Sequence, residues 1–228
     1  MVRAQQFAAD VTDLVSSTLY GTAEFRAMVQ GNHVQVSAYD ADNRIARIPL
    51  YIQREHVADW RYTMSINMDR ESAYIKVLRS NFSLIALVDK NPLVRYEYDA
   101  SMHTAPVAHW QFHAERGAFS HLLGRAQGAG KDVKPHSLSS LHFPVGGGRM
   151  RAGLEDLIEF LIRECHVDSR GGWLGALQES RENYRIIQAR TLARDAQTEV
   201  AAVLAEQGWT VSPPPSSPEL NVEELRRW

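Results

Sequence analysis

The strongest constraint on the fold is a strict alternation of apolar and polar residues between positions 60 and 68. The large apolar side chains at every second position are Trp60, Tyr62, Met64, Ile66 and Met68. A period of two is the period of a β-strand with one buried face and one polar face. The segment therefore predicts a one-sided sheet, whose apolar face needs other elements to cover it.

Further strands are predicted on both sides of this segment. They cover 34–39, 45–52, 73–79, 82–88, 93–98 and 107–115. Short polar segments between them, such as 40–43 and 80–81, indicate turns, and the first predicts a hairpin between 34–39 and 45–52. Connections this short join antiparallel neighbours, because a parallel return needs a crossover of a dozen or more residues.

Helical periodicity is found on both sides of the strands. Helices are predicted over 4–20, 22–30, 118–127 and 154–162, and a long one over 173–206. The predicted fold is therefore α+β, with a twisted antiparallel sheet of five to seven strands. N-terminal and C-terminal helices pack on this sheet, and one C-terminal helix is long.

The chain divides into three parts by composition. Residues 1–150 are predicted to form the sheet domain with a histidine-rich strand, and residues 151–211 a helical part packed on it. Residues 212–228 form a proline-rich linker and tail. The end of this tail, 219–228, is expected to fray rather than to dock as a short helix.

Charge and cysteine content limit the classes of protein and of binding site that the chain can form. The formal net charge is −2, so the chain lacks the global basic field of many nucleic-acid-binding proteins, although a local basic patch remains open. Cys165 is the single cysteine, which excludes an intrachain disulfide and a multi-cysteine zinc site. A structural role is predicted for it. No apolar run approaches the length of a membrane span, so we expect a cytoplasmic protein without membrane contact.

The most informative segment contains histidines on a predicted strand. Six of the nine histidines lie between His103 and His142. On the strand, Trp110 and Phe112 are expected to face the core, and the opposite face carries the predicted catalytic residues His109, Gln111, His113 and Glu115. If the preceding strand pairs with this one, Arg95 and Glu97 share that face.

Two imidazoles suit acid–base chemistry at neutral pH, and Arg95 can stabilise a phosphorane. This combination suits RNA cleavage through the 2′-hydroxyl without a metal or another cofactor. His109 and His113 would lie roughly 13 Å apart along a strand, too far to bind one ion. Only a pair such as His113 with Glu115 can converge on a metal, with a third ligand such as His103 or His121. The alternative is an ordinary solvated face of a one-sided sheet.

A second candidate site is the glycine-rich segment 142–151. Its glycines expose backbone N–H groups, and its arginines precede a predicted helix N-terminus near Leu154. The predicted phosphate-binding residues are Gly147, Gly148, Arg149 and Arg151. The alternative is a glycine turn followed by two solvated arginines.

Residues 74–116 resemble the TumE-like family of toxin–antitoxin toxins. In that family an arginine–tyrosine–aspartate strand precedes a proline- and histidine-rich segment, and ribonuclease toxicity is proposed. The matching residues are Arg95, Asp99, Pro106, His109 and His113. The resemblance implies an RNA-cleaving toxin of a toxin–antitoxin or phage-defence system, with RNA as substrate and a cognate antitoxin-like protein as partner.

Two alternatives belong to other classes. His109-Trp110-Gln111 is similar to the His-hydrophobic-Gln variant of HUH single-strand DNA endonucleases, and Tyr184 with Gln188 resembles their nucleophile helix. That resemblance implies a divalent metal and a covalent tyrosine–DNA adduct. The other alternative is a non-catalytic protein that binds a partner through a groove and its long helix.

Overall fold

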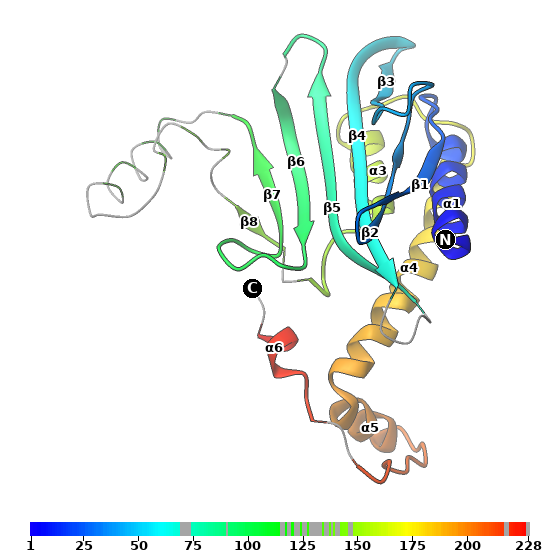
Figure 1. Ribbon diagram of the computed structural model, residues 1–228, viewed down its shortest axis with the longest axis vertical. Coiled ribbons are helices and arrows are strands. Elements are labelled where there is room, and N and C mark those ends of the chain that lie inside the picture. Colours follow the sequence, from blue (N-terminus) through cyan, green and yellow to red (C-terminus); the bar gives the residue numbers. More distant parts are fainter. Residues whose placement is uncertain are drawn as a thin grey trace.

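The computed structural model describes residues 1–68, 74–89, 91–114, 117, 120, 124, 127, 134, 137, 139, 142–145, 148–216 and 219–226. Within these ranges the chain has an α+β fold (Figure 1), as the sequence predicts. The predicted helix over 118–127 lies almost entirely outside the described residues. No helix among the described residues is both long enough and apolar enough to cross a bilayer.

One antiparallel sheet of eight strands forms the centre of the described structure, in the order β1-β2-β4-β5-β6-β7-β8, with β3 also paired to β4. The strands are β1 (Phe25–Gln30), β2 (His33–Ala38), β3 (Ile48–Ile52), β4 (Glu55–Met68), β5 (Ile75–Ala86), β6 (Pro92–Asp99), β7 (Ala108–Phe112) and β8 (Phe143–Pro144). The short strands β1 and β8 take the sheet beyond the predicted five to seven.

The helices gather on one side of the sheet. They are α1 (Val2–Thr18), α3 (Leu154–Arg163), α4 (Trp173–Asp195), α5 (Gln197–Glu206) and α6 (Val222–Leu225). In Figure 1, α1, α3 and α4 lie behind the strands, while α5 and α6 extend below them. The N-terminal helix and the amphipathic α3 agree with the prediction.

The core lies between the helices and the alternating apolar residues of the sheet. Trp60, Phe82 and Tyr96 on neighbouring strands are buried, together with Val15 of α1 and Ile158 of α3. Burial of each such side chain contributes about 1.5–3 kcal/mol. The period-two pattern of β4 is therefore explained by a sheet that is covered on one face.

The pairing corrects one predicted helix and one predicted turn between two strands. Residues 22–30 were predicted as a helix, but β1 pairs with β2 across a tight turn at Gly31, whose φ is 60°. Segments 73–79 and 82–88 form one strand, because Asn81 at the predicted turn pairs with both Thr63 and Glu97. Cross-strand partners outweigh the local turn propensity here.

The predicted hairpin is also corrected, whereas the predicted long C-terminal helix is confirmed in α4, although it does not run unbroken to residue 206. Strand β3 pairs with β4 rather than with β2, and a single bridge between Tyr39 and Ile45 closes the turn between β2 and β3. The long helix is interrupted at Ala196. The Asp195 carbonyl there accepts a hydrogen bond from the Asn221 backbone N–H, which comes from the tail.

The β3–β4 turn depends on one distant carboxylate. Gln53 and Arg54 both have positive φ, at 53° and 66°, which is unfavourable for residues with a side chain. Their backbone N–H groups donate to Asp168 Oδ1 at 3.0 Å and Oδ2 at 2.7 Å. Asp168 also donates its own N–H to the Tyr51 carbonyl. The segment after α3 therefore holds the turn in its strained conformation.

We expect Asp168→Ala to lower the free energy of unfolding by about 2 kcal/mol, because two hydrogen bonds to a charged acceptor are lost. Urea denaturation followed by circular dichroism measures this change. The matched control is Asp42→Ala, which removes an exposed carboxylate paired with Arg44 and should cost less than about 1 kcal/mol. Equal effects of the two substitutions would contradict the proposed role of Asp168.

Candidate functional site

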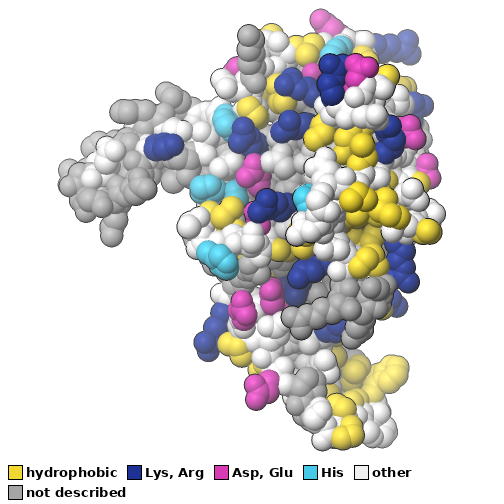
Figure 2. Space-filling view, viewed as in Figure 1, with side chains coloured by type: hydrophobic (Ala, Val, Ile, Leu, Met, Phe, Trp, Pro, Cys, Tyr) yellow, Lys and Arg dark blue, Asp and Glu magenta, His cyan; other side chains and the backbone are white. Residues whose placement is uncertain are grey.

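The face of the sheet opposite the helices carries polar side chains. Cross-strand partners point to the same face, so the register assembles one set from β2 to β7. Its members are Ser37, Thr63, Ser65, Arg79, Asn81, Ser83, Arg95, Glu97, His109 and Gln111. Figure 2 shows this face, where basic, acidic and histidine side chains gather over the middle of the sheet.

The register confirms that the two predicted strands share their polar residues. Glu97 lies opposite His109, and Arg95 lies opposite Gln111. On the other face Trp110 packs against Tyr96, with ring centroids 4.8 Å apart. The helices cover that apolar face (Figure 1). The helices α1, α3 and α4 therefore form no wall along the histidine face.

His109 is held in one orientation inside the protein. It is 1% exposed, and its Nδ1 lies 2.8 Å from the Pro106 carbonyl oxygen, so Nδ1 carries a proton and donates. Its Nε2 is buried and has no hydrogen-bond partner among the described residues. This atom lies 3.7 Å from Glu97 Oε2. The imidazole is almost wholly shielded from solvent, so it acts on the surface mainly through its neighbours.

Glu97 is the more accessible member of this pair. Its Oε1 accepts a hydrogen bond of 2.6 Å from Asn81 Nδ2, and Asn81 Oδ1 accepts one of 2.8 Å from Ser83. The neighbouring His109 lowers the pKa of the Glu97 carboxyl, and Arg95 and Asn81 act in the same direction against the effect of burial. Glu97 is therefore a carboxylate that lies between Asn81 and His109 and is ionised at neutral pH.

His142 joins this pair from the segment before β8. Its ring contacts the His109 ring edge to face, with centroids 4.5 Å apart, and its Nε2 lies 3.0 Å from Gln111 Nε2. Burial lowers the pKa of His142, as does the nearby His109, while Glu97 opposes them. Glu97, His109, His142 and Gln111 thus form one continuous group, here called the Glu97 cluster.

His113 lies beyond this cluster on the same face. Its backbone N–H donates to the Leu93 carbonyl, and its Nε2 is buried without a hydrogen-bond partner in the described part of the chain. Burial lowers the pKa of His113, and Arg95 adds to this effect. Glu115, which was also predicted for the site, lies outside the described residues.

A hollow of about 220 Å³ lies beside the Glu97 cluster. Its lining includes Thr63, Ser65, Arg79, Asp99 and Met102 in addition to the cluster members Glu97 and His109. Arg79 Nε donates to Asp99 Oδ2 at 2.9 Å. The cluster thus has Arg95 and His113 on one side and a hollow lined mostly by polar side chains on the other.

Sequence reasoning missed His142 and Asn81, and it left Glu97 out of the catalytic set. Asn81 lies in a segment that the sequence predicts as a turn. His142 directly precedes the two-residue β8, and only the pairing of β8 with β7 brings it to the cluster. A strand of two residues has no periodicity to detect. The signal that was available was the match of Glu97 with His109 in the predicted register.

The predicted phosphate-binding arginines have partners inside the protein. Arg149 donates to Asp195 Oδ2 at 2.7 Å and lies 3.8 Å from Glu224. Although burial opposes it, the pairing with Asp195 raises the pKa of Arg149. Arg151 donates to the Gly148 carbonyl and lies over the Tyr98 ring. Gly147 lies outside the described residues. Phosphate binding at this segment stays a prediction.

Arg149 also fixes the tail, which was expected to fray. Asn221 Nδ2 donates to Asp195 Oδ1 at 3.1 Å, and the Asn221 backbone N–H donates to the Asp195 carbonyl at 2.8 Å. Asp195 is 5% exposed. The loop before α3, the end of α4 and the tail therefore meet at one buried carboxylate.

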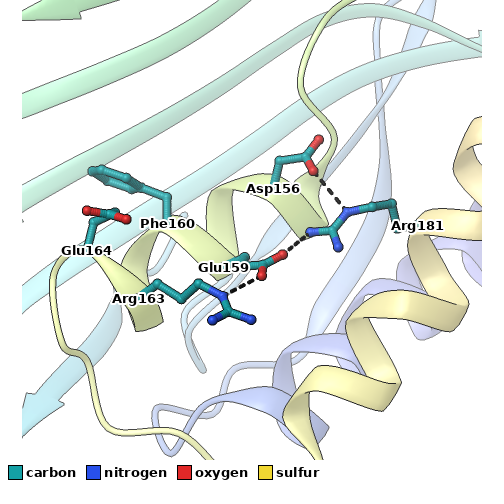
Figure 3. A pocket seen from close by; sticks show the side chains of 6 residues that line it. All are labelled: Asp156, Glu159, Phe160, Arg163, Glu164 and Arg181. Atoms are coloured by element: carbon teal, nitrogen blue, oxygen red, sulfur yellow. Dashed lines mark hydrogen bonds and ion pairs between the residues drawn. The ribbon is translucent and has the colours of Figure 1, made fainter.

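A second hollow lies between α3 and α4 and is lined by charged residues (Figure 3). Arg181 bridges Asp156 and Glu159, and Arg163 donates to Glu159 at 2.6 Å. These side chains satisfy one another, so the hollow is the outer surface of a helix–helix contact. Cys165 lies nearby in the chain, and burial raises the pKa of its thiol, which agrees with an unreactive, structural cysteine.

The predicted tyrosine nucleophile lies on the helix side of the sheet. The Tyr184 hydroxyl accepts a hydrogen bond of 3.0 Å from Gln188 and lies 3.5 Å from the Arg151 carbonyl. Burial raises the pKa of Tyr184. His109 and Gln111 point to the opposite face, so this placement gives the HUH-like alternative no support. Among the described residues, no group of three His, Cys, Asp or Glu side chains is arranged to hold a metal ion.

We expect Arg149→Met to lower the free energy of unfolding by about 3 kcal/mol, because it leaves the buried Asp195 carboxylate unpaired. The tail should also become sensitive to limited proteolysis. The control Arg44→Met breaks an exposed ion pair and should cost less than about 1 kcal/mol. A variant that keeps its stability and its protected tail, but loses binding of inorganic phosphate, would instead favour the phosphate-binding interpretation.

The comparisons with known proteins add no family to this description. No protein-family model, no curated protein and no solved structure matches the chain. The resemblances to TumE-like toxins and to HUH endonucleases therefore stay predictions. The functional assignment depends on the geometry of the polar sheet face.

Proposed function

We propose that this protein is an endoribonuclease that cleaves RNA through its own 2′-hydroxyl on the polar face of the sheet. The observation that carries this proposal is the Glu97 carboxylate, which is ionised, has a side chain that is 28% exposed, and lies 3.7 Å from the buried His109. A carboxylate in this position is a general base, and the cationic Arg95 lies two residues away on the same face.

The role of each residue follows from the proton or charge that must be handled as the 2′-oxygen attacks and the 5′-oxygen leaves. Glu97 accepts the proton of the 2′-hydroxyl as its oxygen attacks phosphorus. Arg95 stabilises the negative charge that develops on the phosphorane. His142, which is half-buried and lies against the His109 ring, donates a proton to the departing 5′-oxygen. The products are a 2′,3′-cyclic phosphate and a 5′-hydroxyl, so atoms and protons balance without a cofactor.

The remaining predicted residues take supporting roles. His109 positions Glu97, because its buried Nε2 faces the carboxylate and its Nδ1 is anchored on Pro106. Gln111 orients His142, and its amide can turn to accept a hydrogen bond when that imidazole is protonated. His113 lies beside Arg95 and binds a neighbouring phosphate of the RNA chain.

Within a cell such an activity is toxic unless it is controlled. The proposal therefore includes the toxin-like role in a toxin–antitoxin or phage-defence system, with an antitoxin-like protein as partner. The competing function is a non-catalytic partner-binding protein. One observation favours it: a histidine that is 1% exposed, as His109 is, is often only a structural residue.

We expect Glu97→Gln to lower kcat/KM for a single-stranded RNA about 10²–10⁴-fold, because it removes the general base. His142→Ala should lower kcat/KM by a factor in the same range, because it removes the general acid. The matched control is Glu55→Gln, which changes an exposed glutamate of β4 and should keep full activity. Cleavage is followed on gels with a labelled oligonucleotide, after circular dichroism has confirmed the fold of each variant.

Expression in a bacterial host connects this chemistry to the cellular role. Wild-type protein should arrest growth and fragment total RNA, and Glu97→Gln should do neither. Unchanged cleavage by the Glu97→Gln and His142→Ala proteins would exclude the proposed base and acid. An intact RNA pool together with normal growth under wild-type expression would favour the partner-binding function.

The pH dependence of kcat/KM provides an independent test. Cleavage needs Glu97 ionised, so activity rises through a pKa below the ordinary value of 4.5. It also needs His142 protonated, so activity falls as pH rises through a pKa below the ordinary 6.5. We therefore expect a bell-shaped profile with an acidic optimum. Full activity maintained above pH 7 would contradict the assignment of His142 as the acid.

A further inference from the structure

The hollow beside Glu97 has the chemical character of a nucleobase subsite. We propose that it binds a guanine base next to the scissile phosphate, and this inference rests on the proposed RNA cleavage. The hollow measures about 220 Å³, which is below the 300–1,000 Å³ typical of pockets for drug-sized ligands. One base is a group of suitable size, while the ribose and phosphate stay on the open sheet face.

A buried atom without a partner distinguishes this hollow from an ordinary solvated surface. His109 is 1% exposed and lines the hollow, and its Nε2 has no hydrogen-bond partner among the described residues. Glu97 Oε2 lies 3.7 Å from this nitrogen. Buried polar groups are normally satisfied, so this arrangement is expected at a site that is completed by a ligand or by a proton.

Hydrogen-bond acceptors line the part of the hollow that lies away from Arg95. Asp99 lies beside Arg79 there; its Oδ1 accepts two hydrogen bonds from Ser101, and its Oδ2 accepts one from Arg79 and can accept one more. Ser65 lies on the neighbouring strand, opposite Arg79 in the register. The Ser65 hydroxyl donates to Gln35 Oε1 at 3.3 Å, so its lone pairs remain able to accept. A ligand in this part must therefore present N–H donors.

Arg79 supplies donors next to these acceptors. Its Nε donates to Asp99 Oδ2, and its side chain is 65% exposed, so the remaining N–H groups of the guanidinium can reach a ligand. Arginine on O6 and N7 is the commonest specific contact to guanine. Met102 also lines the hollow, and a thioether makes favourable contacts with an aromatic ring.

This combination discriminates between the purines. Guanine presents the acceptors O6 and N7 on one edge, and the donors N1–H and N2–H₂ beside them. Arg79 meets the acceptors, and Asp99 with Ser65 meets the donors. Adenine carries an amino group in place of O6 and an unprotonated N1, so it would place a donor against Arg79 and an acceptor against the carboxylate. Guanine is therefore the favoured base.

Nucleotide binding tests the subsite without requiring cleavage. Isothermal titration of wild-type protein with guanosine 3′-monophosphate and with adenosine 3′-monophosphate should show about tenfold tighter binding of the guanine nucleotide. Arg79→Met should abolish most of that preference, and Asp99→Asn is a second variant with the same expectation. The matched control Lys76→Met removes an exposed cation on the same strand, outside the hollow, and should keep the preference.

The outcomes separate the subsite from the catalytic proposal. Equal binding of the two nucleotides, binding of neither, or a preference that survives Arg79→Met would overturn the guanine subsite. A guanine preference that Arg79→Met removes would support it, even if the protein cleaves no RNA and the proposed catalysis fails. If the protein does cleave RNA, cuts should follow or precede guanines in the wild type and lose this preference in Arg79→Met.

Discussion

The long antiparallel pairing of β4, β5 and β6 is the interaction on which the rest of the structure depends. Eleven residues of β4 pair with β5, and each pair places its two side chains on a common face. Trp60, Phe82 and Tyr96 are thereby brought to the helix side, where their burial stabilises the fold. The same register places Asn81, Glu97 and His109 on the other side, which α1, α3 and α4 do not cover. The polar site is thus a geometric consequence of the core.

Polar groups that are buried on this second face need hydrogen-bond partners to offset the cost of losing water. Ser83 is buried but satisfied through Asn81, and Asn81 in turn satisfies one oxygen of Glu97. His109 breaks this pattern, because its Nε2 has no hydrogen-bond partner among the described residues. An unsatisfied buried group costs about 1–3 kcal/mol. A chain optimised only for stability would replace it, and for this reason the Glu97 cluster is a better candidate site than the satisfied ion pairs between α3 and α4.

The sequence predicts those features that depend on local periodicity. It does not predict features that depend on contacts between residues far apart in the chain. Alternation at 60–68 and the apolar stripe in α3 are strong local signals. The predicted strands at 93–98 and 107–115 place Arg95, Glu97, His109 and Gln111 on one face if the two strands pair. The helix predicted over 22–30 is a strand because a neighbouring strand supplies its hydrogen bonds. The partners of Arg149 lie 46 or more residues away at Asp195 and Glu224. No local pattern shows that such an arginine holds the tail.

The two key shifts in the Glu97 cluster have different causes but act in the same direction. His109 and Arg95 lower the pKa of Glu97, whereas burial lowers that of His142. A lowered pKa makes Glu97 an intrinsically weaker base. It also keeps Glu97 ionised at the acidic pH at which the partly buried His142 is still protonated. A raised pKa of Glu97 beside the lowered pKa of His142 would have narrowed the pH range in which both groups are in the required state. The lowered pKa of Glu97 therefore preserves an acidic pH range in which the cluster holds an ionised base and a protonated acid.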